Sequence, residues 1–316
     1  MESIAISIYG SVLLVLGTFG NFSIIIYVNQ ETKYRRITCV LMNYLAWGNI
    51  FHLWSALYRY WYRVTFGIDF RSYRSWICKS HIFLVYFTDR LTIFSLVLVS
   101  LDRCLIIKGF IRFKFVRFVF SKTSTATKSM IIFSTVFSLA LSAMQTCMTN
   151  YERVGDEIFC DWQKYEENVV TITNLIFDIT LPHTLLIGSN IYLYRLLIKH
   201  DRFMGNISMR AFKGGITLIS SKTNISLAKS KNMIKTLIVL NVLHLVSRLP
   251  GYLVTDFIPL IKQNFTDETK NYYDVFLMLS FTYSSSIFYI FIVSSSPFRK
   301  RFWLFVVTKF HKRIDG

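Results

Sequence analysis

Long apolar runs separated by short polar segments recur along the whole chain. A helix needs roughly 20 mostly apolar residues to cross about 30 Å of hydrocarbon, and seven runs reach that length. They lie at about residues 4–28, 37–60, 81–107, 130–148, 171–198, 234–260 and 273–293. The pattern therefore predicts an all-α membrane protein built as a seven-helix bundle.

Composition and charge agree with this prediction and give it a direction. A chain with 53% hydrophobic residues and a mean hydropathy of +0.42 is too apolar for an ordinary soluble domain. Most of its 36 lysines and arginines fall in the connections after the first, third and fifth runs and in the C-terminal tail. Because basic residues near span ends stay on the cytoplasmic side, we expect the N-terminus outside and the C-terminus inside. A basic chain can also indicate nucleic-acid binding, but here the charge follows alternate loops, so we expect no nucleic-acid partner.

The five cysteines are too few for a disulfide scaffold, and no pair has the spacing of metal ligands. Two of them, Cys78 and Cys160, fall outside the membrane on the expected topology. Because the exterior is oxidising, we expect these two to form a disulfide. The bond would tie the loop after the fourth span to the top of the third.

Four ionisable residues interrupt the spans themselves: Asp89, Arg90, Asp178 and Arg248. An unpaired charge at mid-membrane costs about 2.5 to 3.5 kcal/mol on insertion scales. With a rise of about 1.5 Å per residue, all four lie at one depth near the middle of the membrane. Two acids and two bases at one depth predict a buried network that is neutral overall.

The foot of the third span carries the pair that is most typical of a known family. Asp102 and Arg103 end an apolar run, and Arg103 follows Cys78 by 25 residues. Other matching positions are Gly20 and Asn21 in the first span, "LAWGN" at 45–49 in the second, Pro182, Pro250, and "FRKRF" at 298–302. With these motifs the chain resembles the rhodopsin-like (class A) G-protein-coupled receptors, and the resemblance covers essentially all of it.

The resemblance implies an architecture and a function. It implies one receptor domain over residues 1–316, with a short amphipathic helix at about 298–309 after the seventh span. It implies a multi-pass protein of the plasma membrane, whose partners are membrane lipid, an extracellular ligand and a heterotrimeric G protein that meets Asp102 and Arg103. In that fold Asp89 would lie near Arg248, and Arg90 near Asp178.

Several family motifs are altered in this chain. Cys104 follows Arg103 where the family has tyrosine, and Asn49 replaces the sodium-binding aspartate of the second span. Arg248 stands where the family has the tryptophan of the sixth span. In the seventh span the Asn-Pro-x-x-Tyr motif is missing, and Tyr289 takes the place of its proline. We therefore expect a divergent receptor.

The sequence excludes some classes of ligand and favours others. The position of the amine-binding aspartate is Val85, which argues against a biogenic amine, and the absence of lysine from 273–293 excludes a retinal Schiff base. The loop at 150–168 is acidic and would attract a basic peptide, so a neuropeptide-like ligand is favoured. A small-molecule chemosensory receptor and a non-signalling decoy of the same fold remain open. The charged network at Asp89 is either a structural cluster or the element that reads the ligand.

Other classes of protein receive little support. We find no Gly-rich phosphate loop, catalytic triad or metal cluster, so we expect neither enzymatic activity nor a cofactor nor a metal. A transporter or channel is the competing class, but the two halves of the chain show no inverted repeat. The usable outer glycosylation site is Asn264, in the sequence Asn-Phe-Thr.

Overall fold

The protein is described here from a computed structural model, whose described residues are 2–30, 37–111, 116–154, 157–162, 167–195, 198, 220–252 and 267–314. The helices are α1 (Glu2–Gln30), α2 (Ile37–His52), α3 (Tyr58–Phe66), α4 (Ser75–Ile111), α5 (Val116–Cys147), α6 (Glu167–Asn174), α8 (Ser220–Tyr252), α10 (Asp267–Ser294) and α11 (Ser296–Ile314). Between them lie the π-helical turns η2 (Leu53–Leu57) and η4 (Leu175–Thr180), the 3₁₀ turn η3 (Phe70–Ser72), and the strands β1 (Thr149–Val154) and β2 (Glu157–Trp162). The helix that begins with α6 and η4 continues over 181–195.

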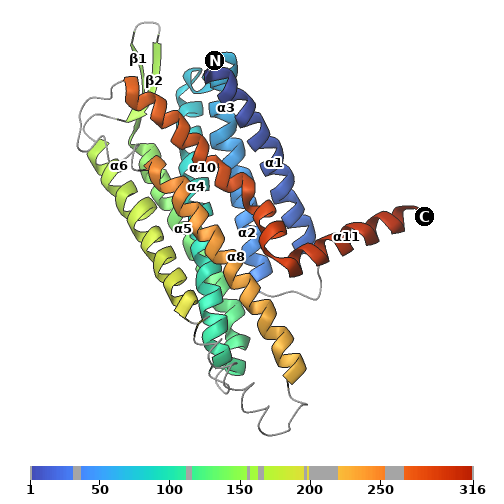
Figure 1. The fold of residues 1–316 in the computed structure, drawn as a ribbon. Helices are drawn as coiled ribbons and strands as arrows, with labels where there is room; N and C mark the ends of the chain where they lie inside the picture. The colour runs from blue at the N-terminus through green and yellow to red at the C-terminus, as the bar shows by residue number, and fades with distance from the viewer. Residues whose placement is uncertain are drawn as a thin grey trace.

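The long helices run side by side as a bundle (Figure 1). The helix α10 packs against α8 and α1, and α4 packs against α2 and α5. The β1–β2 hairpin lies at the same end of the bundle as the N-terminus, and α11 leaves the bundle toward the opposite end (Figure 1). We call the end with the hairpin the disulfide end, because the single bond between Cys78 and Cys160 is made there.

The predicted seven-helix membrane bundle is confirmed. Among the described residues, six helices are long and apolar enough to cross a membrane: Ile4–Asn29, Ser75–Cys104, Lys128–Cys147, Val169–Arg195, Ile234–Tyr252 and Asp274–Ser294. The predicted second span, 37–60, lies in the helix formed by α2, η2 and α3. Residues 253–260 of the predicted sixth span fall outside the described residues, as does the candidate glycosylation site Asn264.

Most helices extend beyond the apolar runs that predicted them. The third was expected from 81 and begins at Ser75, and the sixth was expected from 234 and begins at Ser220. The predicted amphipathic helix at 298–309 is likewise longer, at Ser296–Ile314. The apolar pattern marks only the part of a helix that is immersed in hydrocarbon, whereas backbone hydrogen bonding continues into the polar flanks.

Two of the spans contain wide π-helical turns. In η2 the Tyr58 amide donates to the Leu53 carbonyl, and after η4 the Leu181 amide donates to the Ile176 carbonyl, each five residues back. The second turn precedes Pro182, which has no amide hydrogen to donate to the preceding turn. Such turns are common at functional sites, and η4 contains Asp178.

The acidic segment at 150–168 was expected as a loop, and part of it forms a two-stranded antiparallel hairpin instead. Strands β1 and β2 pair with Thr149 opposite Trp162 and Tyr151 opposite Cys160. Pairing gives hydrogen-bond partners to the backbone N–H and C=O groups of the two strands. The hairpin places Cys160 against the start of α4.

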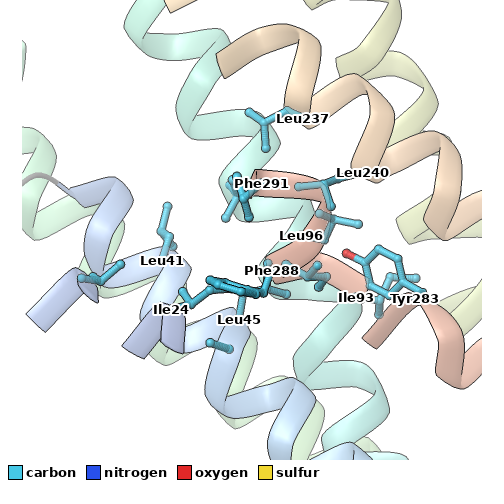
Figure 2. Packing of buried hydrophobic residues seen from close by; sticks show 14 of the residues in the cluster. Ile24, Leu41, Leu45, Ile93, Leu96, Leu237, Leu240, Tyr283, Phe288 and Phe291 are labelled. Atoms are coloured by element: carbon cyan, nitrogen blue, oxygen red, sulfur yellow. The ribbon is translucent and has the colours of Figure 1, made fainter. Parts of the chain in front are cut away.

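The largest group of buried apolar residues in the described part of the chain lies between the first, second, third, fifth, sixth and seventh helices of the bundle. It includes Ile24, Leu41, Leu96, Leu240 and Phe288, which come together in Figure 2. Other large apolar side chains point outward, and Phe133 and Val293 are 71% and 76% exposed. Apolar side chains on both the inside and the outside of the helices are what a membrane-spanning bundle requires.

Candidate functional site

Two ion pairs cross the middle of the bundle, and both start from neighbouring residues of α4. Arg90 pairs with Asp178, and Arg248 pairs with Asp89. Successive residues of a helix point about 100° apart, so Asp89 and Arg90 face different neighbours. The two pairings implied by the sequence are therefore present, and both start at the same level of α4.

The pair between Arg90 and Asp178 is sealed inside the bundle. The Arg90 Nε donates to Asp178 Oδ1 at 2.7 Å, and Nη2 donates to Oδ2 at 2.8 Å, which makes a two-point fork. The side chains are 1% and 5% exposed. On its other sides the guanidinium donates to Ser142 Oγ at 3.0 Å and lies over the ring of Tyr86.

Polar side chains from α5 and α6 complete this first pair. Asn174 Oδ1 accepts hydrogen bonds from Arg90 Nη2, at 3.4 Å, and from Gln145 Nε2. Ser142 and Gln145 come from α5, and Asn174 and Asp178 come from the helix over 167–195. Arg90 thus ties the third, fourth and fifth helices together.

The pair between Arg248 and Asp89 is built differently. Arg248 Nη1 contacts Asp89 Oδ1, and the hydroxyl of Tyr252 donates to Asp89 Oδ2. Arg248 Nη2 also donates to Ser284 Oγ of α10 at 3.3 Å. His52 Nε2 of α2 lies 3.8 Å from the same carboxylate. This group joins the second, third, sixth and seventh helices.

The two pairs differ in their accessibility. The side chain of Asp89 is 14% exposed, whereas those of Arg90 and Arg248 are 1% and 4% exposed. Asp89 is therefore the most exposed of these four charged side chains. The Arg90 pair is more deeply buried, which suits a role in holding the helices in register.

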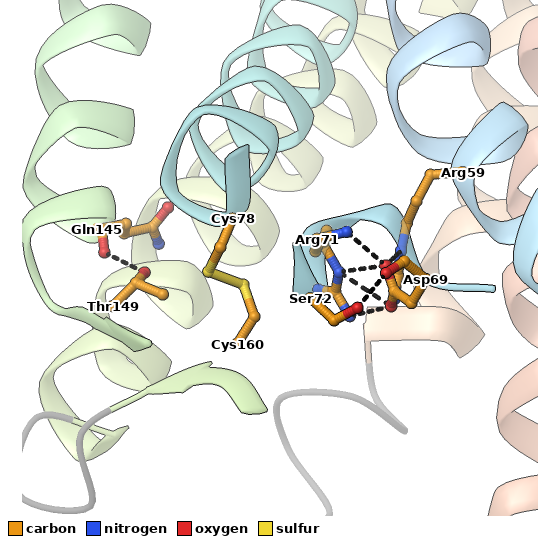
Figure 3. The surroundings of a disulfide bond; sticks show 8 residues. All are labelled: Arg59, Asp69, Arg71, Ser72, Cys78, Gln145, Thr149 and Cys160. Atoms are coloured by element: carbon orange, nitrogen blue, oxygen red, sulfur yellow. Dashed lines mark hydrogen bonds and ion pairs between the residues drawn. A yellow bond between two sulfur atoms is a disulfide. The ribbon is translucent and has the colours of Figure 1, made fainter. Parts of the chain in front are cut away.

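The disulfide end is closed by covalent and ionic contacts (Figure 3). Cys78 and Cys160 are bonded, with their Cα atoms 5.9 Å apart, and Cys78 is fully buried. Nearby, Asp69 accepts hydrogen bonds from Arg59 and Arg71. Burial acts to raise the pKa of Asp69, but the hydrogen bonds and charges of the two arginines outweigh it and hold the pKa well below its usual range. Asp69 is thus ionised at neutral pH and fixes the segment before α4.

Asp102 and Arg103 lie near the other end of α4, where both are 6% exposed. Arg103 Nε is 3.9 Å from Asp102 Oδ2. Next to them Cys104 packs with Leu193 and Ile234, so the third, fifth and sixth helices meet here. About one helical turn closer to the disulfide end, Asn241 donates to Ser100 Oγ at 2.9 Å and to Asn190 Oδ1 at 2.7 Å.

The remaining motif positions all take part in helix contacts. Asn21 Nδ2 donates to the Gly17 and Ser284 carbonyls, and Asn49 Nδ2 donates to Asn21 Oδ1 at 3.3 Å. The Tyr289 hydroxyl donates to the Leu16 carbonyl at 3.2 Å, which ties the seventh helix to the first. Pro250 lies inside α8.

The candidate residue Val85 lies on α4 one turn from Asp89, toward the disulfide end. It packs with a buried cluster that includes Leu53, Leu57 and Phe281. Its surroundings are therefore apolar, and a ligand amine would find no counter-charge at this position. The polar contact at this level is Thr88, whose hydroxyl lies 3.1 Å from Ser55 Oγ.

Sequence reasoning found the four charges but missed most of their partners. It did not identify Ser142, Asn174, Tyr252 or His52. It also missed two buried histidines, His183 and His244, whose rings are neighbours. Histidine within a predicted span is a signal in its own right, and it could have marked three of these positions.

Comparison with known families gives one match. The family described as "7 transmembrane receptor (rhodopsin family)" matches residues 20–288, which is most of the chain. The comparison with curated protein sequences found no match to this chain. The matched range includes both ion pairs, the disulfide, and Asp102 and Arg103.

Proposed function

Because this chain belongs to the rhodopsin family of seven-transmembrane receptors, we propose that it is a plasma-membrane receptor that activates a heterotrimeric G protein when an extracellular ligand binds. We infer that the disulfide end faces outward and that α11 lies on the cytoplasmic side. The distribution of lysine and arginine among the loops supports this orientation.

The observation that carries the proposal is the arrangement of groups along α4. Cys78 lies near its start, Asp89 at its middle, and Asp102 and Arg103 near its other end. One helix thus connects an outer anchor, a partly accessible charged group and the pair that meets the G protein in this family. A ligand that changes the contacts of Asp89 can act on the whole helix.

We further infer that the Asp89–Arg248 pair is the element that the ligand biases. A ligand shifts a conformational equilibrium only through contacts that differ between the two states. A cationic group of the ligand would compete with Arg248 for the carboxylate of Asp89, and Arg248 would then keep its contact with Ser284. The acidic segment at 150–168 favours a basic, peptide-like ligand for the same reason.

The altered motifs of the sixth and seventh helices favour one second candidate, a non-signalling receptor of the same fold. Arg248 and Tyr289 are held by polar contacts at positions where the family has other residues. In such a protein the ion pairs would have a structural role only. Both candidates predict ligand binding, so they must be separated by signalling.

A screen of basic and amidated peptides with a promiscuous G-protein readout tests the proposal. The ligand-dependent signal is expected to disappear in Arg103→Ala at unchanged surface expression. Lys235→Ala is the matched control, because Lys235 is an exposed basic residue on α8, and it should keep the signal. Ligand binding without any signal would support the decoy, and an ion current that survives Arg103→Ala would contradict the receptor function.

A further inference from the structure

A second polar cluster lies inside the bundle next to the Asp89 group. It consists of His183 from the fifth helix, His244 from α8 and Tyr283 from α10. The three side chains are 4%, 0% and 0% exposed. The two imidazole centroids are 5.5 Å apart, and the centroids of His244 and Tyr283 are 4.7 Å apart.

Most polar side-chain atoms of this cluster lack hydrogen-bond partners within the described part of the chain. His183 Nδ1 lies 2.7 Å from the Ile179 carbonyl, which can only accept, so Nδ1 carries the proton and Nε2 presents a lone pair. Neither His183 Nε2, the two ring nitrogens of His244, nor the Tyr283 hydroxyl has a hydrogen-bond partner there. Buried polar groups are nearly always paired, so these unpaired atoms mark a place where a further group can bind.

The spacing of the rings fits a shared metal ion. A Zn²⁺–N bond is about 2.0 to 2.1 Å, and two imidazoles on one tetrahedral ion have centroids about 5 Å apart. The observed separation is 5.5 Å. A backbone carbonyl that holds Nδ1 and leaves Nε2 bare is also the usual support of a metal-binding histidine.

We propose that His183 and His244 form a site for a transition-metal ion of the Zn²⁺ class. The ring of Tyr283 packs edge-on against His244, and its buried hydroxyl is a candidate for a third, weaker contact. Imidazole nitrogen favours Zn²⁺ and Cu²⁺ over Mg²⁺ and Ca²⁺, which prefer oxygen. Among the described residues no group of three or more His, Cys, Asp or Glu side chains is placed to hold a metal, so the proposed site has two imidazoles.

The position of the site suggests what the ion does, and this step rests on the proposed signalling function. His183 also lies against the ring of Tyr252, at a centroid distance of 6.0 Å, and Tyr252 donates to Asp89. An ion held by His183 and His244 would join the fifth and sixth helices directly beside the group that reads the ligand. It would therefore restrain these helices and lower the ligand-dependent signal.

Two other buried histidines, His52 and His81, are arranged differently. His52 lies beside the carboxylate of Asp89, and His81 Nε2 contacts the Ser55 carbonyl. Each stands without a second imidazole in ring contact among the described residues. His81, which is buried like His183, therefore provides a matched control.

Thermal unfolding of the purified full-length protein tests the site without any ligand or G protein. Micromolar Zn²⁺ is expected to raise the melting temperature saturably, by about 3 °C or more, and Mg²⁺ should not. His183→Phe and His244→Phe keep an apolar ring at each position, and each should abolish the shift. His81→Phe should retain it.

A bridging water instead of a metal would leave the wild-type protein without a Zn²⁺-dependent shift, and this result would overturn the proposal. A shift that persists in both His183→Phe and His244→Phe would also overturn it, because the ion would then bind elsewhere. Since the readout is unfolding, failure here leaves the proposed receptor function intact, and loss of signalling in another assay leaves this site intact.

Discussion

Asp89 and Arg90 are adjacent in the chain, and the structure gives them different surroundings. Arg90 is enclosed by Asp178, Ser142 and Asn174, whereas Asp89 is partly accessible and meets Arg248 and Tyr252. A buried charge that loses its partner is strongly destabilising, but replacing both partners by apolar residues is often neutral. The Arg90 pair should therefore behave as a structural pair.

The variant Arg90→Leu leaves the carboxylate of Asp178 buried without its counter-charge, and we expect it to lower the free energy of unfolding by about 3 to 5 kcal/mol. Arg90→Leu with Asp178→Leu should recover most of that loss. Thermal unfolding and surface expression of the two variants measure this. If the double variant is no more stable than Arg90→Leu, the pair does not contribute to stability in the way described.

The four charged residues could be predicted because an ionisable side chain in a membrane helix is costly and must be paired. Their neutral partners could not be predicted. A serine in a helix commonly donates to its own backbone, as Ser138 does to the Ser134 carbonyl, so its identity says nothing about a neighbour. The hydrogen bond from Arg90 to Ser142 depends on how α5 packs against α4, and the sequence alone does not give that packing.

At the scale of elements, the apolar pattern predicted which segments are helical but not their full extent. Residues 220–233 are helical without being apolar enough to mark a span, because backbone hydrogen bonds do not require a membrane. The π turns η2 and η4 have no signature in the apolar pattern. The two strands of the hairpin after the fourth helix could not be predicted either, since they are too polar to show an alternating apolar pattern.

A polar contact between helices gives a prediction at this scale. Asn241 is fully buried and binds Ser100 and Asn190, so it links the sixth helix to the third and fifth close to Arg103. Each such hydrogen bond in a membrane contributes on average about 0.6 kcal/mol. We expect Asn241→Leu to release the sixth helix and to raise the ligand-independent signal of the receptor.

Measurement of basal G-protein activation at matched surface expression tests this effect. Ser138→Ala is the control, because Ser138 is equally buried but donates only within its own helix, and it should leave the basal signal unchanged. A basal signal in Asn241→Leu that equals that of the wild-type protein would show that this link does not restrain the sixth helix.

The whole molecule is organised around α4. This helix is joined to the hairpin by the disulfide, to the fourth and fifth helices through Arg90, and to the sixth and seventh through Asp89 and Arg248. The seven-helix bundle and the two ion pairs could be predicted from sequence. The difference in access between the two ion pairs could not, because it depends on how side chains from four other helices fill the space around them.

The exchange of the two partners, Asp89→Arg with Arg248→Asp, tests the central claim most directly. Each single change leaves like charges facing each other in the bundle, so we expect each to lose surface expression and ligand-dependent signal. The double variant restores opposite charges and should regain a substantial part of both, although Ser284 and Tyr252 then face altered partners. A double variant that recovers neither would contradict the claim that this pair links ligand binding to the receptor's output.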